Sequence, residues 1–199
     1  MNPSSVSRGR YAFDGESNRA AEVGLLEKIR AGDVAAFAEW LERSWRPLVL
    51  YCARILGNRD GAEDVAQEAF IRIWERRCHW RPQSSLRAIL YTIARNLSLN
   101  QRSSTLARAR RLVARQLGTM RSGSLQERVE AADFERALRH AISLLPPRQK
   151  EILTLSRVDG LSRAEIAQVT GLSPQTVANH LATALANLRR QLEPFFRER

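Results

Sequence analysis

The sequence is poor in cysteine and in long apolar runs, and each shortage excludes a class of protein. Its 199 residues include only two cysteines, Cys52 and Cys78, and His79 is the only histidine near either. This set supports neither a disulfide framework nor a four-ligand zinc site, so we expect reduced thiols, no metal and no cofactor. No apolar run reaches the length of about 18 residues that a membrane-spanning helix needs, and the N-terminus lacks the apolar core of a signal peptide. We therefore expect a cytoplasmic protein without membrane insertion.

Lysine is also scarce, and arginine takes its place. Of the 32 basic residues 30 are Arg, and the formal net charge is +11. Arg binds phosphate in a bidentate way that Lys cannot, so a polyanionic partner is favoured. Residues 81–121 contain nine Arg and no Asp or Glu, which predicts a nucleic-acid contact rather than an ordinary solvated surface of mixed charge.

Residues 161–188 have the pattern of a helix-turn-helix. Ser162 and Glu165 are spaced as a capping box, Gly171 can end the first helix in a left-handed conformation, and Ser173 with Pro174 can begin the second. Such a pair of helices points to DNA. The alternative is an amphipathic helix pair in some other bundle.

The second helix of this motif carries polar side chains suited to DNA bases. Asn and Gln match the paired acceptor and donor of adenine, and the N-terminal part of a recognition helix reaches the base edges. We expect DNA contacts from Arg163, Ser173, Gln175, Thr176, Asn179 and His180.

The rest of the chain predicts helices and no strands, and hence an all-α fold of two small domains. We expect a flexible tail at residues 1–21, a four-helix domain at 22–103, a linker at 104–132 and a second domain at 133–199. The expected helices of the first domain cover residues 22–31, 34–56 with a kink at Pro47, 60–77 and 86–103. Asp33 is expected to cap the second of these, and Asp60 with Glu63 to start the third.

Helical periodicity also predicts which faces are buried. In residues 60–77 the inward side chains should be Ala62, Val65, Ala69 and Ile73. In residues 86–103 they should be Leu86, Leu90, Ile93 and Leu97, with Arg87, Tyr91, Arg95 and Arg102 outward.

Three segments in this order resemble the extracytoplasmic-function (ECF) sigma factors of bacteria, which keep only sigma regions 2 and 4. They are DGAEDVAQEAFIRIWER (60–76), LRAILYTIARNLSLNQR (86–102) and LLPPRQKEILTLSRVDGLSRAEIAQVTGLSPQTVANHL (144–181). The resemblance implies a bacterial RNA polymerase sigma factor that directs core polymerase to specific promoters and promotes initiation. The helix-turn-helix would then read the minus 35 element.

The resemblance implies two further sites. The exposed face at Glu63, Asp64, Gln67 and Glu68 would dock on the coiled coil of the β′ clamp of core polymerase. Without the resemblance, the favoured explanation of the same face is a solvated surface with i,i+4 pairs such as Glu68 with Arg72. Contacts to the minus ten element would come from Trp80, Arg81, Ser84, Arg87, Tyr91, Arg95, Asn96 and Asn100.

An aromatic ring among arginines suits melted DNA, because a ring can stack on an unpaired base while guanidinium groups hold phosphates. Tyr91 is the residue expected to do this, whereas Trp80 is equally explained as an anchor in the core. Family members commonly carry Trp where Ile89 stands and Asp where Asn100 stands.

Two other function classes remain open on the sequence alone. The C-terminal segment also resembles LuxR-type domains, so a stand-alone helix-turn-helix regulator is the main alternative, and a helical adaptor without a DNA role is the third. No catalytic set of side chains or phosphate-binding glycine loop is present, so we expect no enzyme activity. The family further implies an anti-sigma factor as a partner, which could hold the protein at the inner membrane.

Overall fold

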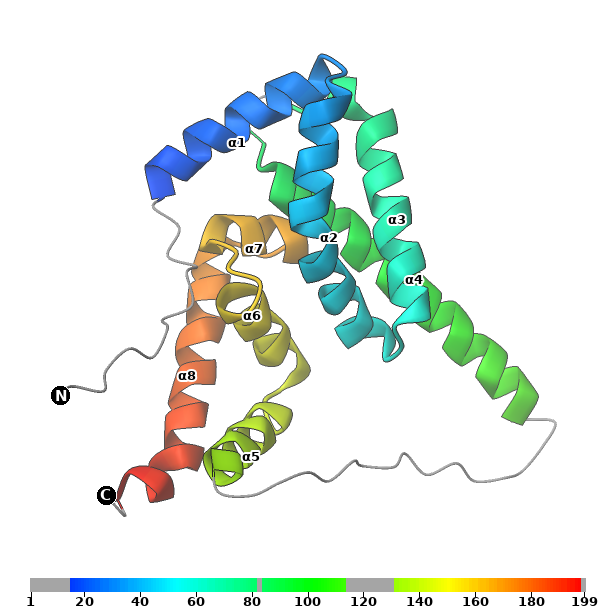
Figure 1. Ribbon diagram of the computed structural model, residues 1–199. Helices are drawn as coiled ribbons and strands as arrows, with labels where there is room; N and C mark the ends of the chain where they lie inside the picture. The colour runs from blue at the N-terminus through cyan, green and yellow to red at the C-terminus, as the bar shows by residue number, and fades with distance from the viewer. Residues whose placement is uncertain (1–14, 82–83, 114–130, 198–199) are drawn as a thin grey trace.

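The computed structural model describes residues 15–81, 84–113 and 131–197, and within these ranges every regular element is a helix (Figure 1). The expected tail up to residue 14 and the central part of the expected linker, residues 114–130, lie outside the described residues. The all-α fold class is confirmed. In chain order the elements are α1 Gly15–Arg30, α2 Val34–Leu56, α3 Asp60–Glu75, the short 3-10 helix η1 Arg77–His79, α4 Leu86–Val113, α5 Ala131–Ser143, α6 Pro147–Arg157, α7 Arg163–Thr170 and α8 Pro174–Arg197.

Helices α1 to α4 form the first unit, in which α2, α3 and α4 pack on one another. The inner face of α3 is the predicted one, since Ala62, Val65, Ala69 and Ile73 are all buried. An aromatic cluster fills the space between α2 and α3, where Phe37 lies 4.9 Å from Trp74 between ring centroids. Aromatic pairs of this kind contribute about 0.5–1.5 kcal/mol each beyond the area they bury.

The helix boundaries of the first unit show where local sequence signals succeed and fail. Asp33 caps α2 as predicted, because its Oδ1 accepts a hydrogen bond of 2.9 Å from the Ala36 N–H. Helix α3 begins at Asp60 as predicted, with Asp60 and Glu63 in its first turn, but the side chain that accepts a hydrogen bond there is Asn58, at 2.8 Å from the Gly61 N–H. Helix α1 begins at Gly15, seven residues before the predicted start, and α4 continues beyond residue 103 to Val113.

Helices α5 to α8 form the second unit. Its own small core consists of Ala141, Leu145, Leu153, Ala184, Leu188 and Leu192, which join α5 and α6 to the middle of α8. Pro147 stands at the first turn of α6, where its missing N–H leaves no hydrogen bond unmade.

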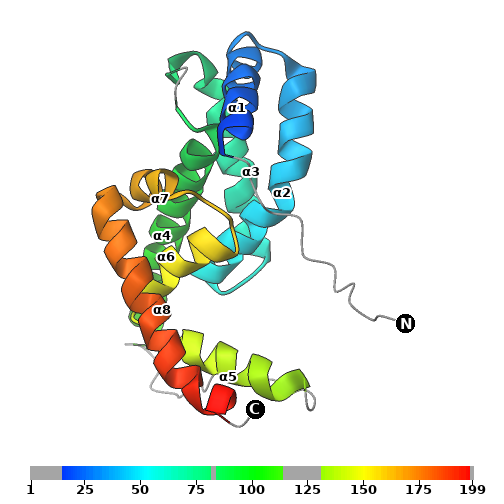
Figure 2. The ribbon, with the colours of Figure 1, turned by 90° about the vertical axis from the view of Figure 1, so that its left-hand side faces the viewer.

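The two units are packed against each other rather than held apart. Both ribbon views place α7 beside α4 (Figures 1 and 2), and these two helices are in direct contact. One continuous apolar core runs from α2, α3 and α4 into α6 and α7, so that Leu90 and Ile166 belong to the same cluster. The first half of α4 is consequently buried on nearly all sides, as expected of a helix with neighbours all round.

No helix in the described part of the chain is long and apolar enough to cross a membrane.

Candidate functional site

The helix-turn-helix has the local geometry that the sequence predicted. The Ser162 Oγ accepts from the Glu165 N–H at 3.3 Å, and the Glu165 carboxylate accepts from the Ser162 N–H at 2.7 Å, which completes the capping box. Gly171 ends α7 with φ of 69°. Ser173 then caps α8, where its Oγ accepts a 3.0 Å hydrogen bond from the Thr176 N–H. These contacts fix the angle at which α8 leaves the turn.

The start of α8 presents the predicted polar face. Val177 is fully buried beneath it, while Ser173, Gln175 and Asn179 are exposed and Thr176 and His180 are half-exposed. The Gln175 amide donates to the Asn179 Oδ1 at 3.1 Å, so two groups able to hydrogen-bond adenine already lie side by side. Arg163, at the start of α7, is exposed as well. All six predicted residues thus lie on the two helices of the motif or, for Ser173, at the cap between them, and all reach solvent.

The acidic face of α3 is only partly engaged by internal ion pairs. Glu63 pairs with Arg59 at 2.9 Å, and Glu68 pairs with Arg72 at 2.7 Å, the i,i+4 contact that the sequence suggested. Asp64 and Gln67 are exposed, and Asp64 makes no ion pair among the described residues. The face therefore keeps an uncompensated carboxylate available to a basic partner.

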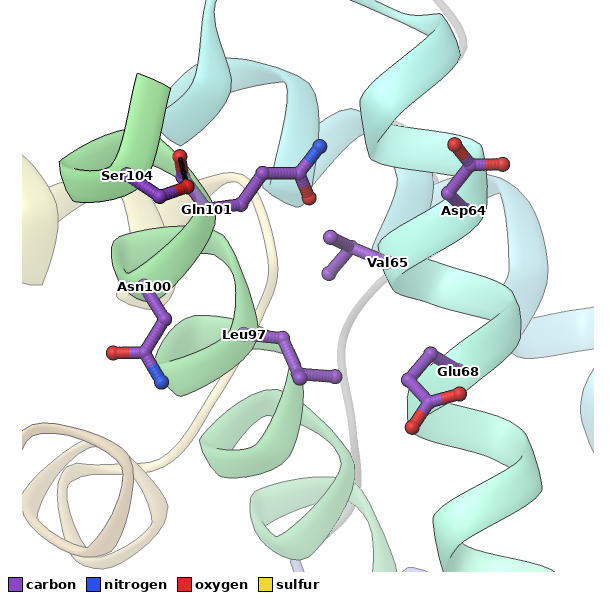
Figure 3. A pocket seen from close by; sticks show the side chains of 7 residues that line it. All are labelled: Asp64, Val65, Glu68, Leu97, Asn100, Gln101 and Ser104. Carbon is purple, nitrogen blue, oxygen red and sulfur yellow. Dashed lines mark hydrogen bonds between the residues drawn. The ribbon is translucent and has the colours of Figure 1, made fainter. Parts of the chain in front are cut away.

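A groove runs between α3 and α4 (Figure 3). It is lined by residues of the predicted polymerase face on α3 and by Asn100 of the predicted minus ten set on α4. Its volume is about 630 Å³. Val65 and Leu97 point into it from opposite helices and form an apolar floor, while polar side chains form the rim. The lining residues are Asp64, Val65, Glu68, Leu97, Asn100, Gln101 and Ser104. Periodicity assigned Val65 and Leu97 to the interior and could not indicate that they also line an open groove.

The structure contradicts the predicted orientation of Tyr91. Its exposed fraction is 3%, and its ring packs 4.9 Å from that of Tyr51 between centroids. The neighbouring Ile89 is buried as well. Tyr91 lies against Tyr51 of α2 and near Asp159 of the second unit, which periodicity within α4 alone could not reveal, because an outward face of one helix becomes an inner face when other elements pack on it.

The remaining residues predicted for the minus ten element fall into two groups. Trp80 is half-buried against the core and its Nε1 donates to the Ile73 carbonyl at 3.3 Å, which supports the anchor interpretation. Arg81, Asn96 and Asn100 are exposed, and Ser84 is half-exposed.

Comparison with known proteins settles the family. The family described as "Sigma-70 region 2" matches residues 40–111, and "Sigma-70, region 4" matches residues 135–188. The ECF RNA polymerase sigma factor SigW of Bacillus subtilis (strain 168) is 28% identical over 84% of this chain and 94% of its own length. SigL of Mycobacterium tuberculosis (strain H37Rv), also an ECF RNA polymerase sigma factor, is 31% identical over 87% of this chain and 92% of its own. The chain belongs to the ECF sigma factors.

A solved structure shows the same fold. The sigma factor RpoE from Bartonella quintana, crystallised with the anti-sigma factor NepR, matches with a TM-score of 0.57 at 23% identity, over 80% of this chain and 98% of that one. As a sigma factor, the protein directs RNA polymerase to promoters. The stand-alone regulator is thereby set aside.

In this sigma factor a clasp of charged groups joins region 4 to region 2, and no local sequence pattern predicts it. Arg54 of α2 donates twice to the Asp159 carboxylate, at 2.7 and 2.5 Å, although the two residues are 105 positions apart. Only 3% of the Asp159 side chain is exposed. Burial raises the pKa of the Asp159 carboxyl, and the Arg54 guanidinium opposes that rise.

The arginines of α4 complete the clasp. The Arg95 Nε lies 2.6 Å from the Glu151 Oε1, and the other oxygen of that carboxylate binds Arg148 at 2.7 Å. Arg87 donates to the Gly160 carbonyl at 3.2 Å. Arg87 and Arg95 were predicted to face outward toward DNA, but in this structure their guanidinium groups are held by region 4.

Proposed function

We propose that this sigma factor binds core polymerase through α3, reads the minus ten element with α4 and the loop before it, and reads the minus 35 element with α8. Membership of the family supports the three roles together. The observation that carries the assignment of surfaces is the contrast between an exposed acidic face on α3 and an exposed amide-bearing face on α8, at separate places on the molecule (Figure 1). Polymerase supplies the chemistry, and the sigma factor itself acts by binding.

The polymerase contact centres on Asp64 and Gln67. Asp64 is exposed, has no internal ion pair among the described residues and stands at the rim of the groove between α3 and α4. A basic side chain of the β′ clamp could pair with this carboxylate while its aliphatic stem covers Val65 and Leu97. The groove thus offers both parts of a docking site for a long cationic side chain.

Reversal of the charge at this position tests the polymerase contact. Asp64→Arg should abolish co-purification with core polymerase and leave the helical content unchanged, because the side chain is exposed. Glu75→Arg is the matched control, since it makes the same reversal of charge on the same helix, and its position in the last turn of α3 favours a cation. Normal core binding by Asp64→Arg would reject the proposed surface.

The minus ten contact would be made by Arg81, Asn96 and Asn100, which are exposed, and by Tyr91, Arg87 and Arg95 once region 4 has moved away from them. Truncation of buried Tyr91 would remove packing as well as any DNA contact, so it is a poor test. Arg81→Ala and Asn96→Ala are better variants, because both side chains are exposed. In holoenzyme they should reduce strand opening, measured by permanganate reactivity, and leave core binding intact. Equal loss of both properties would contradict this role.

The minus 35 contact would be made by Gln175, Asn179 and His180, with Ser173 and Thr176 at the start of α8 and Arg163 on a phosphate. No Lys or Arg stands between Ser173 and Leu188, so few charge contacts to phosphates come from the recognition helix itself. We therefore expect weak duplex binding by the free protein. Gln175→Ala should relax the base preference of the holoenzyme at one promoter position, as shown by transcription from a promoter library.

We also propose an anti-sigma factor as a regulator and the cytoplasm as the site of action. The complex of RpoE with NepR shows that a protein of this fold is held by an anti-sigma factor. An anti-sigma factor anchored in the inner membrane would hold this protein at the membrane, and the membrane-spanning segment would then belong to the anti-sigma factor.

A further inference from the structure

The covered stripe on α4 is the basis of a further inference. Arg87, Tyr91 and Arg95 are spaced four residues apart and lie on one side of the helix. Region 4 engages this side throughout: Gly160 accepts from Arg87, Glu151 pairs with Arg95, and the Asp159 carboxylate lies close enough to Tyr91 to act on its hydroxyl. The basic and aromatic side chains suited to melted DNA are thus the ones that the second domain covers.

The groups that cover the stripe resemble a nucleic-acid backbone in their chemistry. Two carboxylates and a carbonyl oxygen present acceptors to three guanidinium groups, those of Arg54, Arg87 and Arg95. Phosphate oxygens would present the same kind of acceptor to the same donors. A DNA strand and region 4 therefore cannot both occupy this side of α4.

The closed arrangement also holds features that favour its opening. The hydroxyl of Tyr51 is buried and lacks a hydrogen-bond partner among the described residues. A buried polar group without a partner is unfavourable, and water would satisfy this hydroxyl if region 4 moved away. Asp159 would likewise regain its hydration. The clasp offsets these losses, so closure depends on its ion pairs.

We infer that region 4 is a built-in inhibitor of this sigma factor, which covers the Arg87–Tyr91–Arg95 stripe of the free protein and must undock before α4 can receive melted DNA. The inference rests on the proposed minus ten role of α4. It adds that the chain inhibits itself, without any partner, and that the Arg54–Asp159 ion pair holds the inhibited state. A partner that separates the domains activates the protein, and one that joins them silences it.

The experiment breaks the clasp at a residue outside the proposed DNA and polymerase surfaces. Arg54→Met keeps the aliphatic stem and removes the ion-pair partner of buried Asp159, which then keeps only the nearby charge of Arg87. This loss is relieved when region 4 undocks and the carboxylate meets water. Arg43→Met is the matched control, because it makes the same substitution on the same helix and removes only the exposed pair with Glu39. Domain separation is measured on the full chain by small-angle X-ray scattering and by hydrogen exchange of residues 86–97.

DNA access is measured with a short fluorescein-labelled single-stranded oligonucleotide of mixed sequence, followed by anisotropy. The wild type and Arg43→Met should be compact and bind weakly. Arg54→Met should be expanded, exchange faster over residues 86–97 and bind on the order of tenfold tighter, since the population of open chains sets the apparent affinity. Its helical content by circular dichroism should match that of the wild type.

The double variant Arg54→Met with Asp159→Asn distinguishes the loss of this ion pair from a general folding defect. With both charges gone no ion is left buried, so the double variant should be more compact than Arg54→Met alone. An expanded wild type, or an Arg54→Met chain that stays compact with unchanged affinity, would overturn the inference. Separation of the domains in Arg54→Met without tighter DNA binding would overturn it too. In that case, strand opening by the Arg81→Ala holoenzyme shows whether the proposed minus ten role of α4 has failed as well.

Discussion

Removal of a single hydroxyl from the interior should stabilise this sigma factor. Tyr51 is 3% exposed, and its hydroxyl has no hydrogen-bond partner among the described residues. Burial raises the pKa of this phenol far above its usual range, so the hydroxyl carries no charge at neutral pH. Tyr51→Phe keeps the ring, its contact with Tyr91 and the Arg54 guanidinium 5.7 Å from its centroid. Only the unpaired polar atom is lost.

The magnitude follows from the burial of that atom. An unpaired buried polar group costs about 1–3 kcal/mol of stability. Tyr51→Phe recovers only part of this cost, because removal of the oxygen leaves a small void. We expect the free energy of unfolding to rise by about 1 kcal/mol, which raises the melting temperature by about 2–4 °C in a protein of this size. Tyr51→Ala should instead lower it by about 3–5 kcal/mol, since the whole ring is removed.

Urea and thermal unfolding, followed by far-ultraviolet circular dichroism, measure both variants against the wild type. The reasoning is refuted if Tyr51→Phe lowers the free energy of unfolding by about 1 kcal/mol or more, the value of an ordinary hydrogen bond. That result would mean that the hydroxyl is bonded in solution and that the closed arrangement is less strained than we infer.

Three further outcomes are expected. Ser162→Ala should lower the free energy of unfolding by about 0.5–2 kcal/mol in urea titrations, because it removes the side-chain cap of α7, and no measurable loss would contradict the capping geometry. Iodoacetamide should modify exposed Cys78 and spare Cys52 in the native chain, as peptide mass spectrometry can check, since Cys52 is buried and burial raises its pKa to about 11. That shift also predicts a pH dependence: the unfolded thiol ionises near its ordinary pKa of 9.0, the folded one not until about 11, so stability is kept below pH 9 and declines toward pH 11. In Cys52→Ala this part of the decline should be missing.

The sequence predicted well what depends on neighbouring residues. The capping box at Ser162, the left-handed Gly171 and the cap at Asp33 are each set within a few positions of chain, and the structure confirms all three. The buried face of α3 follows from its 3.6-residue period. The roles proposed for exposed residues on α3 and α8 came from the resemblance to the family and stay predictions.

The sequence could not predict what depends on residues far apart. Arg54 and Asp159 are separated by 105 positions, and nothing local distinguishes either from a surface charge. Tyr91 was placed outward from the periodicity of α4 alone, whereas Tyr51 of α2 packs on its ring and Asp159 of region 4 lies near its hydroxyl.

Promoter-directed transcription is the most direct test of this account. Sigma-free bacterial core polymerase would be given genomic fragments with and without the protein, and run-off transcripts compared. The account predicts discrete new transcripts that are lost with Asp64→Arg and kept with Glu75→Arg. Absence of new transcripts, together with footprints on duplex DNA made by the protein alone, would contradict it.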